Sequence, residues 1–322
     1  MKIKVPDYFL KFKCIADKCD DSCCIGWEID IDEATLGKYA AMGGEIGTEI
    51  REKTQHGYFP LAKNGRCAFL DECGLCRIIS AVGDGYLCDI CREHPRYYGI
   101  GDSTIEGGLG LACPEVARII LGTTEKPHFV TVEATPAYES EDEYAKESDE
   151  LRELIYTEIY GADAEDIVGR MRSLAKYADD LGFALISGSD MPIYERTCDA
   201  DISDFVDHAR EIFSECEALT EEWAERLEAV RAETVASLIA ADASKLRALL
   251  YYFTHRYVRE RADEMTLGES VLFALYSSLL IFAIADTYEV RSYERAAVLF
   301  SKNIEYSTDN VDLVLGELSE FL

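Results

Sequence analysis

Cysteine is distributed very unevenly along this chain, and that distribution limits how its first third can fold. Ten of the twelve cysteines lie at or before residue 113, and only Cys198 and Cys216 follow. Buried free cysteines behave as small apolar residues, but that role does not account for ten of them in 113 residues. A reducing compartment disfavours a disulfide framework. We therefore expect thiolate–metal bonds to hold this region together.

The apolar segments predict a cytoplasmic protein with no membrane span. Met1 to Pro6 lacks the apolar stretch and cleavage site of a secretory signal. The most apolar run, Val271 to Ala285, has 15 residues, whereas a spanning helix needs about 20. We expect this run to be a buried core helix.

The charge of the chain is strongly negative and unevenly placed. The formal net charge is -30, with 14 basic and 19 acidic side chains in residues 1–120 and 18 and 43 in residues 121–322. Such a field repels nucleic acid and anionic membrane surfaces and favours a basic or lysine-bearing partner. A solvated acidic surface without any partner explains the same composition.

The pattern along the chain predicts a mainly α protein in three parts. Residues 1–125 form an irregular cysteine-rich metal-binding domain, in which closely spaced glycines indicate tight turns and close backbone approach. Residues 126–150 form an acidic connector, and residues 151–322 form an α-helical bundle domain.

A few elements can be placed individually in the N-terminal and connecting parts. Trp27, Ile29 and Ile31 alternate with acidic residues, as in a half-buried strand. Pro114 begins a helix that stops at Gly122. Phe129 to Val132 predicts another strand.

In the C-terminal part the periodicity is helical. Thr220 starts a helix whose stripe runs through Trp223, Leu227, Val230 and Leu238. The positions of Leu246, Leu249, Leu250, Phe253 and Tyr257 mark another helix. Thr266 and Glu269 form a capping-box pattern before the apolar helix.

The cysteines are spaced as metal ligands are. Cys14, Cys19, Cys23 and Cys24 come first, then Cys67 and Cys76, then the Cys88-x2-Cys91 pair, then Cys113. A pair two residues apart brings both sulfurs to one metal, and thiolate sulfur selects soft or borderline metals. An all-sulfur ligand set suits structural zinc and an iron–sulfur cluster alike, so both stay open.

Several motifs together resemble a known family. They are Val5-Pro-Asp-Tyr, Phe12-Lys-Cys-Ile, Cys23-Cys-Ile-Gly-Trp, Gly65-Arg-Cys-Ala-Phe-Leu, Leu87-Cys-Asp-Ile-Cys-Arg-Glu-His-Pro-Arg and Leu111-Ala-Cys-Pro-Glu-Val-Ala-Arg. This set resembles the FliB-type flagellin lysine-N-methylases and the wider family of zinc- or iron-chelating cysteine-cluster proteins. The resemblance covers residues 5 to about 121, and beyond them it is much looser.

The resemblance implies methyl transfer from S-adenosylmethionine to lysines of flagellin by a protein that carries an iron–sulfur cluster, [4Fe–4S]. The cysteines that match the family pattern are Cys14, Cys19, Cys23, Cys24, Cys67, Cys76, Cys88, Cys91 and Cys113. Cys73 falls in a variable turn and is expected to be incidental. Nine thiolates exceed one four-cysteine site, which leaves two centres, or one centre with spare thiols.

The sequence contains no recognisable methyl-transfer motif. The chain has no Gly-x-Gly-x-x-Gly after a strand and no radical-type Cys-x3-Cys-x2-Cys spacing, so the catalytic residues stay unknown. Arg92, His94 and Arg96 follow the Cys88/Cys91 pair and are candidates to hold the methyl donor or to donate to cluster sulfurs. Ordinary turn residues are the alternative reading.

A basic and aromatic patch follows in the acidic C-terminal part. Tyr252, His255, Arg256 and Arg259 suit either an anionic ligand or, preferably, internal ion pairs. Competing with a methylase are two readings without methyl transfer: a zinc or iron–sulfur interaction protein, and a redox module.

Overall fold

The computed structural model describes residues 2–19, 21–54, 56–63, 65–101, 104–133, 145–197, 199–258 and 267–322. Its contacts divide the chain into two compact units. The body unit consists of residues 1–12, 98–112 and 116–322, and the cysteine-rich unit of residues 13–97 and 113–115. The cysteine-rich unit is thus an insertion in the chain of the body unit. The predicted linear order assigned residues 1–12, 98–112 and 116–125 to the N-terminal domain instead.

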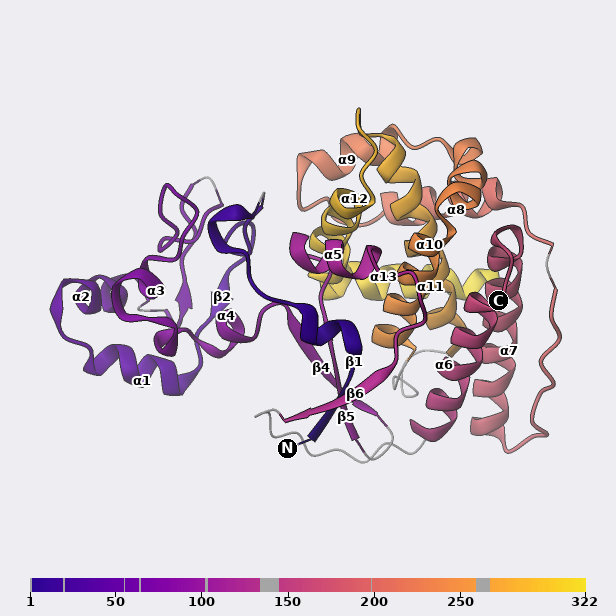
Figure 1. The fold of residues 1–322 in the computed structure, drawn as a ribbon, viewed down its shortest axis with the longest axis horizontal. Helices are drawn as coiled ribbons and strands as arrows, with labels where there is room; N and C mark the ends of the chain where they lie inside the picture. The colour runs from indigo at the N-terminus through magenta and orange to yellow at the C-terminus, as the bar shows by residue number, and fades with distance from the viewer. Residues whose placement is uncertain are drawn as a thin grey trace. The chain divides into compact units, whose positions relative to one another are not determined.

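The body unit is built mainly from helices (Figure 1). They are α5 (Pro114–Leu121), α6 (Ala145–Tyr160), α7 (Ile167–Ser187), α8 (Ile202–Ser214), α9 (Glu221–Glu228), α10 (Val235–Tyr257), α11 (Leu267–Asp286), α12 (Tyr293–Phe300) and α13 (Thr308–Leu318). A single π-helical turn, Ser301–Glu305, follows α12. The mainly helical class is as predicted, although the structure adds a small sheet.

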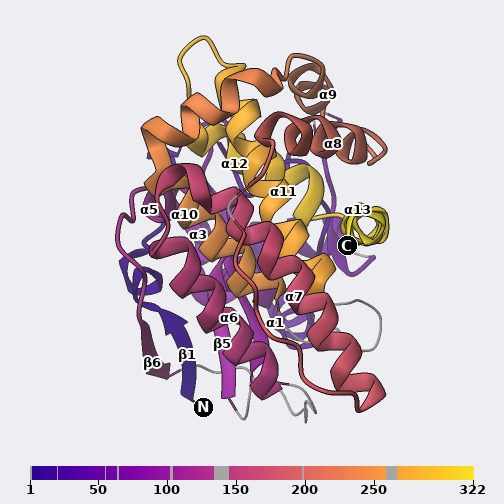
Figure 2. The same ribbon diagram turned by 90° about the vertical axis from the view of Figure 1, so that its right-hand side faces the viewer.

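Helix α11 is the centre of this unit. It contacts α7, α8, α10, α12 and α13, and 18 of its 20 residues are buried. By length and composition α11 is able to cross a membrane, but 94% of its most apolar window is buried inside the protein. The predicted core helix from Val271 to Ala285 is therefore confirmed. Figure 2 shows α6 and α7 side by side in front of α11.

Two details of the helical prediction change. Thr220 caps α9 as expected, since its hydroxyl accepts from the Trp223 backbone N–H at 3.3 Å. The expected continuous stripe to Leu238 is wrong, because α9 ends at Glu228 and a new helix begins at Val235 after a short 3-10 turn. Thr266 and Arg259 lie outside the described residues.

A four-stranded sheet completes the body unit. Its strands are β1 (Lys2–Pro6), β4 (Arg96–Gly101), β5 (Thr104–Leu109) and β6 (Phe129–Glu133), in the order β4-β5-β1-β6. Strand β1 pairs parallel to β5 and antiparallel to β6. The strand expected at Phe129 to Val132 is confirmed, and it lies in this sheet. Residues 134–144 of the predicted connector are outside the described residues.

The sheet needs glycine at one position. A Cβ on Gly107 would lie 3.1 Å from the Tyr98 ring and 3.2 Å from a Val5 methyl group. Gly107 thus lets the neighbouring side chains close over β5, next to the apolar cluster of Ile3, Val5 and Ile105. Close backbone approach was expected in this glycine-rich segment, but the strands themselves were not.

The elements described in the cysteine-rich unit are short. They are β2 (Ile29–Asp30), β3 (Tyr58–Phe59), α1 (Glu33–Ala41), α2 (Gly44–Lys53), α3 (Arg77–Val82) and α4 (Asp89–Glu93). Ile29 and Ile31 are buried as the alternation predicted, although β2 itself has two residues. The buried core is Ile29, Ile31, Tyr39, Ile50, Phe59, Cys67, Phe69, Ile78 and Cys88. Thiols are thus part of the packing of this unit.

Candidate functional site

Backbone contacts bring two distant cysteines together. The Cys67 N–H donates to the Cys24 carbonyl at 2.7 Å, and Ile25 forms a bridge with Arg66. Gly26 N–H donates to the Gly65 carbonyl at 2.9 Å, and both glycines have positive φ, which favours glycine. Two tight turns therefore join the Cys23-Cys24 segment to the Cys67 segment.

A second turn carries Cys76 to the same region. Leu70 and Cys76 form a bridge, and the Arg77 N–H donates to the Phe69 carbonyl at 2.8 Å. Between them, the Asp71 carboxylate accepts from the backbone N–H groups of Cys73 and Leu75 at 2.9 and 2.8 Å. Cys76 is half-buried at the start of α3, whereas Cys73 is exposed at the tip of the turn.

The Cys88-x2-Cys91 pair lies at α4. Cys88 is fully buried and Cys91 half-buried. A hydrogen bond from the Cys91 thiol, supported by backbone N–H groups, lowers the pKa of Cys88 to about 7 despite its burial. The same bond, together with burial, raises the pKa of Cys91 well above its usual range. Cys88 is therefore the thiol of this pair that ionises first.

The other thiols interact in the same way. Hydrogen bonding with Cys23 and burial raise the pKa of Cys24, and the charges of Cys23, Cys67 and Cys76 raise it further. Burial raises the pKa of Cys67, as do the neighbouring charges of Cys76, Cys23 and Cys88. The charges of Cys24 and Cys67 likewise raise the pKa of Cys91. The structure thus gathers six thiols, those of Cys23, Cys24, Cys67, Cys76, Cys88 and Cys91, which we call the thiol cluster.

The other cysteines have different surroundings. Burial raises the pKa of Cys19, and the charges of Cys14 and Cys23 add to the effect, which places Cys14 and Cys19 beside Cys23. Cys113 is half-buried immediately before α5. Cys216 is buried among the helices of the body unit, and burial raises its pKa to about 12.

The thiol cluster suits a metal by its chemistry more than by its arrangement. Sulfur donors are the ligands of structural zinc and of iron–sulfur clusters, and six thiols are more than the four that one such site needs. In the part of the chain that the structure describes, however, no group of three or more His, Cys, Asp or Glu side chains is positioned to hold a metal ion. The structure therefore shows thiols gathered in one region without the geometry of a finished metal site.

The three candidates for cofactor binding have different surroundings. Arg92 forms ion pairs with Asp89 and Glu93, and its side chain is 44% exposed. The His94 ring lies 6.2 Å from the ring of Trp27, and Arg96 begins β4. Arg92, His94 and Arg96 stay candidate cofactor-binding residues.

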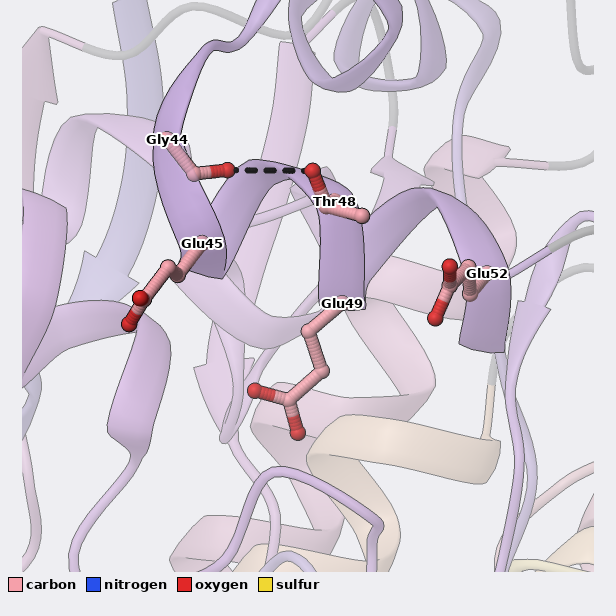
Figure 3. A pocket seen from close by; sticks show the side chains of 5 residues that line it. All are labelled: Gly44, Glu45, Thr48, Glu49 and Glu52. Carbon is pink, nitrogen blue, oxygen red and sulfur yellow. Dashed lines mark hydrogen bonds between the residues drawn. The ribbon is translucent and has the colours of Figure 1, made fainter.

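A shallow open pocket of about 530 Å³ lies on α2 (Figure 3). Gly44, Glu45, Thr48, Glu49 and Glu52 line it. Glu49 is neutralised by Arg77, and the other two carboxylates line the pocket from the same helix. Sequence reasoning missed this pocket, for which the three- and four-residue spacing of the acids on a helix was the available signal.

The described residues of the basic and aromatic patch on α10 pair with other groups of the body unit. Arg256 pairs with the buried Glu305 carboxylate at 3.1 Å and donates to the Tyr252 hydroxyl at 2.7 Å. Tyr252 and Tyr257 both donate to Glu305, at 2.8 and 3.0 Å. The preferred reading of this patch as internal ion pairs is thus confirmed for Arg256.

Comparison with known proteins finds sequence relatives but no family model and no similar solved structure. The chain is 34% identical to the lysine-N-methylase of Salmonella typhimurium over 129 residues, which are 36% of this chain and 31% of that protein. The lysine-N-methylase of Salmonella choleraesuis gives the same figures. The match thus spans about a third of the length of these enzymes.

A third relative is matched over most of its own length. The flagellar biosynthetic protein FliU of Salmonella muenchen is 33% identical over 129 residues, which are 36% of this chain and 75% of FliU. Identity at this level over three quarters of a protein shows common descent. Over the part of its length that the match covers, the chain therefore belongs to the family of the flagellar biosynthetic protein FliU.

Proposed function

We propose that this protein is a protein-lysine N-methyltransferase that acts on flagellin in the cytoplasm, with S-adenosylmethionine as methyl donor. The observation that carries the proposal is the 34% identity to two proteins named lysine-N-methylase. The name of the FliU relative supports a flagellar substrate. The net charge of -30 favours a lysine-bearing partner over nucleic acid or an anionic membrane.

Lysine methylation makes two demands on such an enzyme. The ε-ammonium has a pKa near ~10.4, so a base or a desolvating site must release the amine. The methyl group must then be presented in line with the nitrogen lone pair. When bound, S-adenosylmethionine supplies an electrophilic methyl group. Neither demand requires radical chemistry.

We further propose that the cysteine-rich unit holds an iron–sulfur cluster, [4Fe–4S], with zinc as the alternative. The thiol cluster supports this proposal, because thiols from three stretches of chain influence one another's ionisation. Thiolate–metal bonds would fasten these turns, which otherwise share a small core. Cys14, Cys19 and Cys113 remain candidate ligands beside the six.

Mass spectrometry of co-expressed flagellin tests the methylase proposal. Flagellin from cells with this protein should carry lysines whose masses rise in single-methyl steps, and flagellin from cells without it should not. Unmodified flagellin under anaerobic, cluster-replete conditions would refute methylation and favour an interaction or redox protein.

Metal analysis tests the second proposal separately. Protein purified anaerobically should be brown and contain iron and acid-labile sulfide. Colourless protein with stoichiometric zinc and no iron would replace the cluster with structural zinc and leave the methylase proposal standing.

A further inference from the structure

The body unit contains a charged group between its sheet and its helices. Lys4 on β1 and Glu106 on β5 are register neighbours. The Glu106 side chain is completely buried, and its Oε2 accepts from Arg152 of α6 at 2.8 Å. His255 of α10 is also completely buried, with Nδ1 3.8 Å from the same oxygen. Removing charged side chains from water costs free energy, so a buried charged group of this kind points to a role beyond stability.

One member of this group is a lysine ammonium held as a ligand would be. The Lys4 Nζ lies 3.2 Å from Glu106 Oε1 and 4.4 Å from the centre of the Phe129 ring. A carboxylate and an aromatic face are the two features with which proteins bind alkylammonium groups. The Lys4 side chain is 37% exposed, whereas that of Arg152 is 4% exposed. The Lys4 side chain thus reaches Glu106 from the surface, whereas Arg152 is buried beside Glu106.

His255 presents a basic nitrogen to the same carboxylate. Its Nε2 lies 3.1 Å from the Gly107 carbonyl oxygen. A carbonyl only accepts hydrogen bonds, so Nε2 carries a proton, and in the neutral form of the ring Nδ1 holds the lone pair. Nδ1 faces Glu106, on which the ammonium rests. The carboxylate therefore lies between a lysine ammonium and an imidazole base.

The contact between Lys4 and Glu106 is one that another lysine can make. Arg152 pairs with Asp149 and with Oε2 of Glu106, whereas the Lys4 ammonium lies against Oε1 of Glu106. If the Lys4 side chain swings out to solvent, a second lysine ammonium that enters makes the same contact with Oε1.

We propose that Lys4 occupies the acceptor-lysine site of the enzyme as an internal competitor, in which Glu106 binds the substrate ammonium, Phe129 covers it and His255 receives its proton. This inference rests on the proposed function. The proton leaves the substrate nitrogen for His255 Nδ1 by way of the Glu106 carboxylate. The freed lone pair forms the N–C bond with the methyl group of the sulfonium donor, and the S–C bond breaks with its electrons on sulfur, so the donor leaves as a thioether.

Binding of a small lysine analogue tests the site without turnover. Anaerobically purified full-length protein is titrated with Nα-acetyl-lysine methylamide in a calorimeter, and the norleucine counterpart, which lacks the ammonium, is the ligand control. A side chain that fills a site nine-tenths of the time weakens binding about tenfold. Lys4→Met should therefore bind the lysine amide about tenfold more tightly than wild type. Lys4→Arg keeps a cation in the site and should show no gain.

The outcomes separate the site from the reaction. Equal affinity of wild type and Lys4→Met, or equal binding of the norleucine compound, would overturn the inference even if flagellin is methylated. Tighter lysine binding by Lys4→Met without any methylation would overturn the proposed function and keep the site. If Lys4→Met binds the lysine amide more tightly and flagellin is methylated, the KM for flagellin should be lower in Lys4→Met than in wild type. Lys4→Gln, which leaves a hydrogen-bond donor for Glu106, replaces Lys4→Met if the latter does not fold, and the same results decide.

Discussion

The link between α2 and α3 of the cysteine-rich unit gives a prediction with a calculable size. Arg77 donates to both oxygens of Glu49, at 2.7 and 2.6 Å, and Lys53 donates to Oε1 at 2.7 Å. The hydrogen bonds from Arg77 and then from Lys53 lower the pKa of Glu49 from 4.5 to about 2. Glu49→Gln keeps the size of the side chain and removes its charge.

The pKa shift sets an upper limit on the stabilisation. One pKa unit corresponds to about 1.4 kcal/mol, so the full shift of Glu49 would be worth about 3 kcal/mol. The side chains of Glu49 and Arg77 are 26% and 41% exposed, and solvent screens such a pair. We therefore expect Glu49→Gln to lower the free energy of unfolding of this unit by about 1 kcal/mol at neutral pH.

The pH dependence follows from the direction of the shift. A carboxyl whose folded pKa is depressed stabilises the fold fully above its unfolded pKa and loses that contribution as the pH falls through the folded value. The difference between wild type and Glu49→Gln should thus be nearly full above pH 4.5, shrink as the pH falls below 4.5 and vanish only below pH 2.

The two tryptophans allow the unit to be followed alone. Trp27 lies in the cysteine-rich unit and Trp223 in the body unit. In a Trp223→Phe background, urea unfolding observed by Trp27 fluorescence reports the cysteine-rich unit. Glu45→Gln on the same helix is the matched control, since no ion pair of Glu45 is found among the described residues. An equal loss from both variants, or a difference that does not shrink between pH 4.5 and pH 2, would refute the reasoning.

Three further predictions concern the proposed metal and the core. Cys73→Ser should keep the metal content of the protein and Cys91→Ser should lose it, and equal loss would show that the ligand assignment is wrong. After chelation, limited proteolysis should cut within residues 13–97 and spare 116–322, and uniform digestion of both would contradict a metal-dependent unit. Phe253→Ala removes a buried ring that packs against other aromatic rings of the body unit. It should cost about 3–5 kcal/mol in thermal unfolding, and a loss below about 1 kcal/mol would contradict this packing.

Helices were predictable where one segment carried its own signal. The apolar run at α11 and the proline at the start of α5 describe local structure, so one stretch of sequence was sufficient. The sheet was not predictable in this way. Strand β1 has five residues and finds its partners about 100 and 130 residues later. The glycines of β4 and β5 indicated turns, because their role in the sheet depends on neighbours from other strands.

The candidate sites show the same difference between local signals and contacts that depend on the fold. Cysteine spacing identified the thiols as a set, but the turns that bring Cys24 beside Cys67 depend on positive-φ glycines at 26 and 65. The sequence singled out His255 only as a member of the basic and aromatic patch and did not single out Glu106, because the two residues are 149 positions apart. Their meaning comes from burial and from shared contacts, which only the folded chain shows.

The insertion of the cysteine-rich unit between β1 and β4 links the two units through chain entropy. When residues 13–97 are folded, they are a compact link between two segments of one sheet. When they are unfolded, the same 85 residues become a flexible loop that pairing of β1 with β5 must close. Closing a loop of that length costs about 4 kcal/mol in the ideal-chain estimate. Unfolding of the cysteine-rich unit should therefore weaken the attachment of β1 in the body unit, and with it the contact between Glu106 and Lys4.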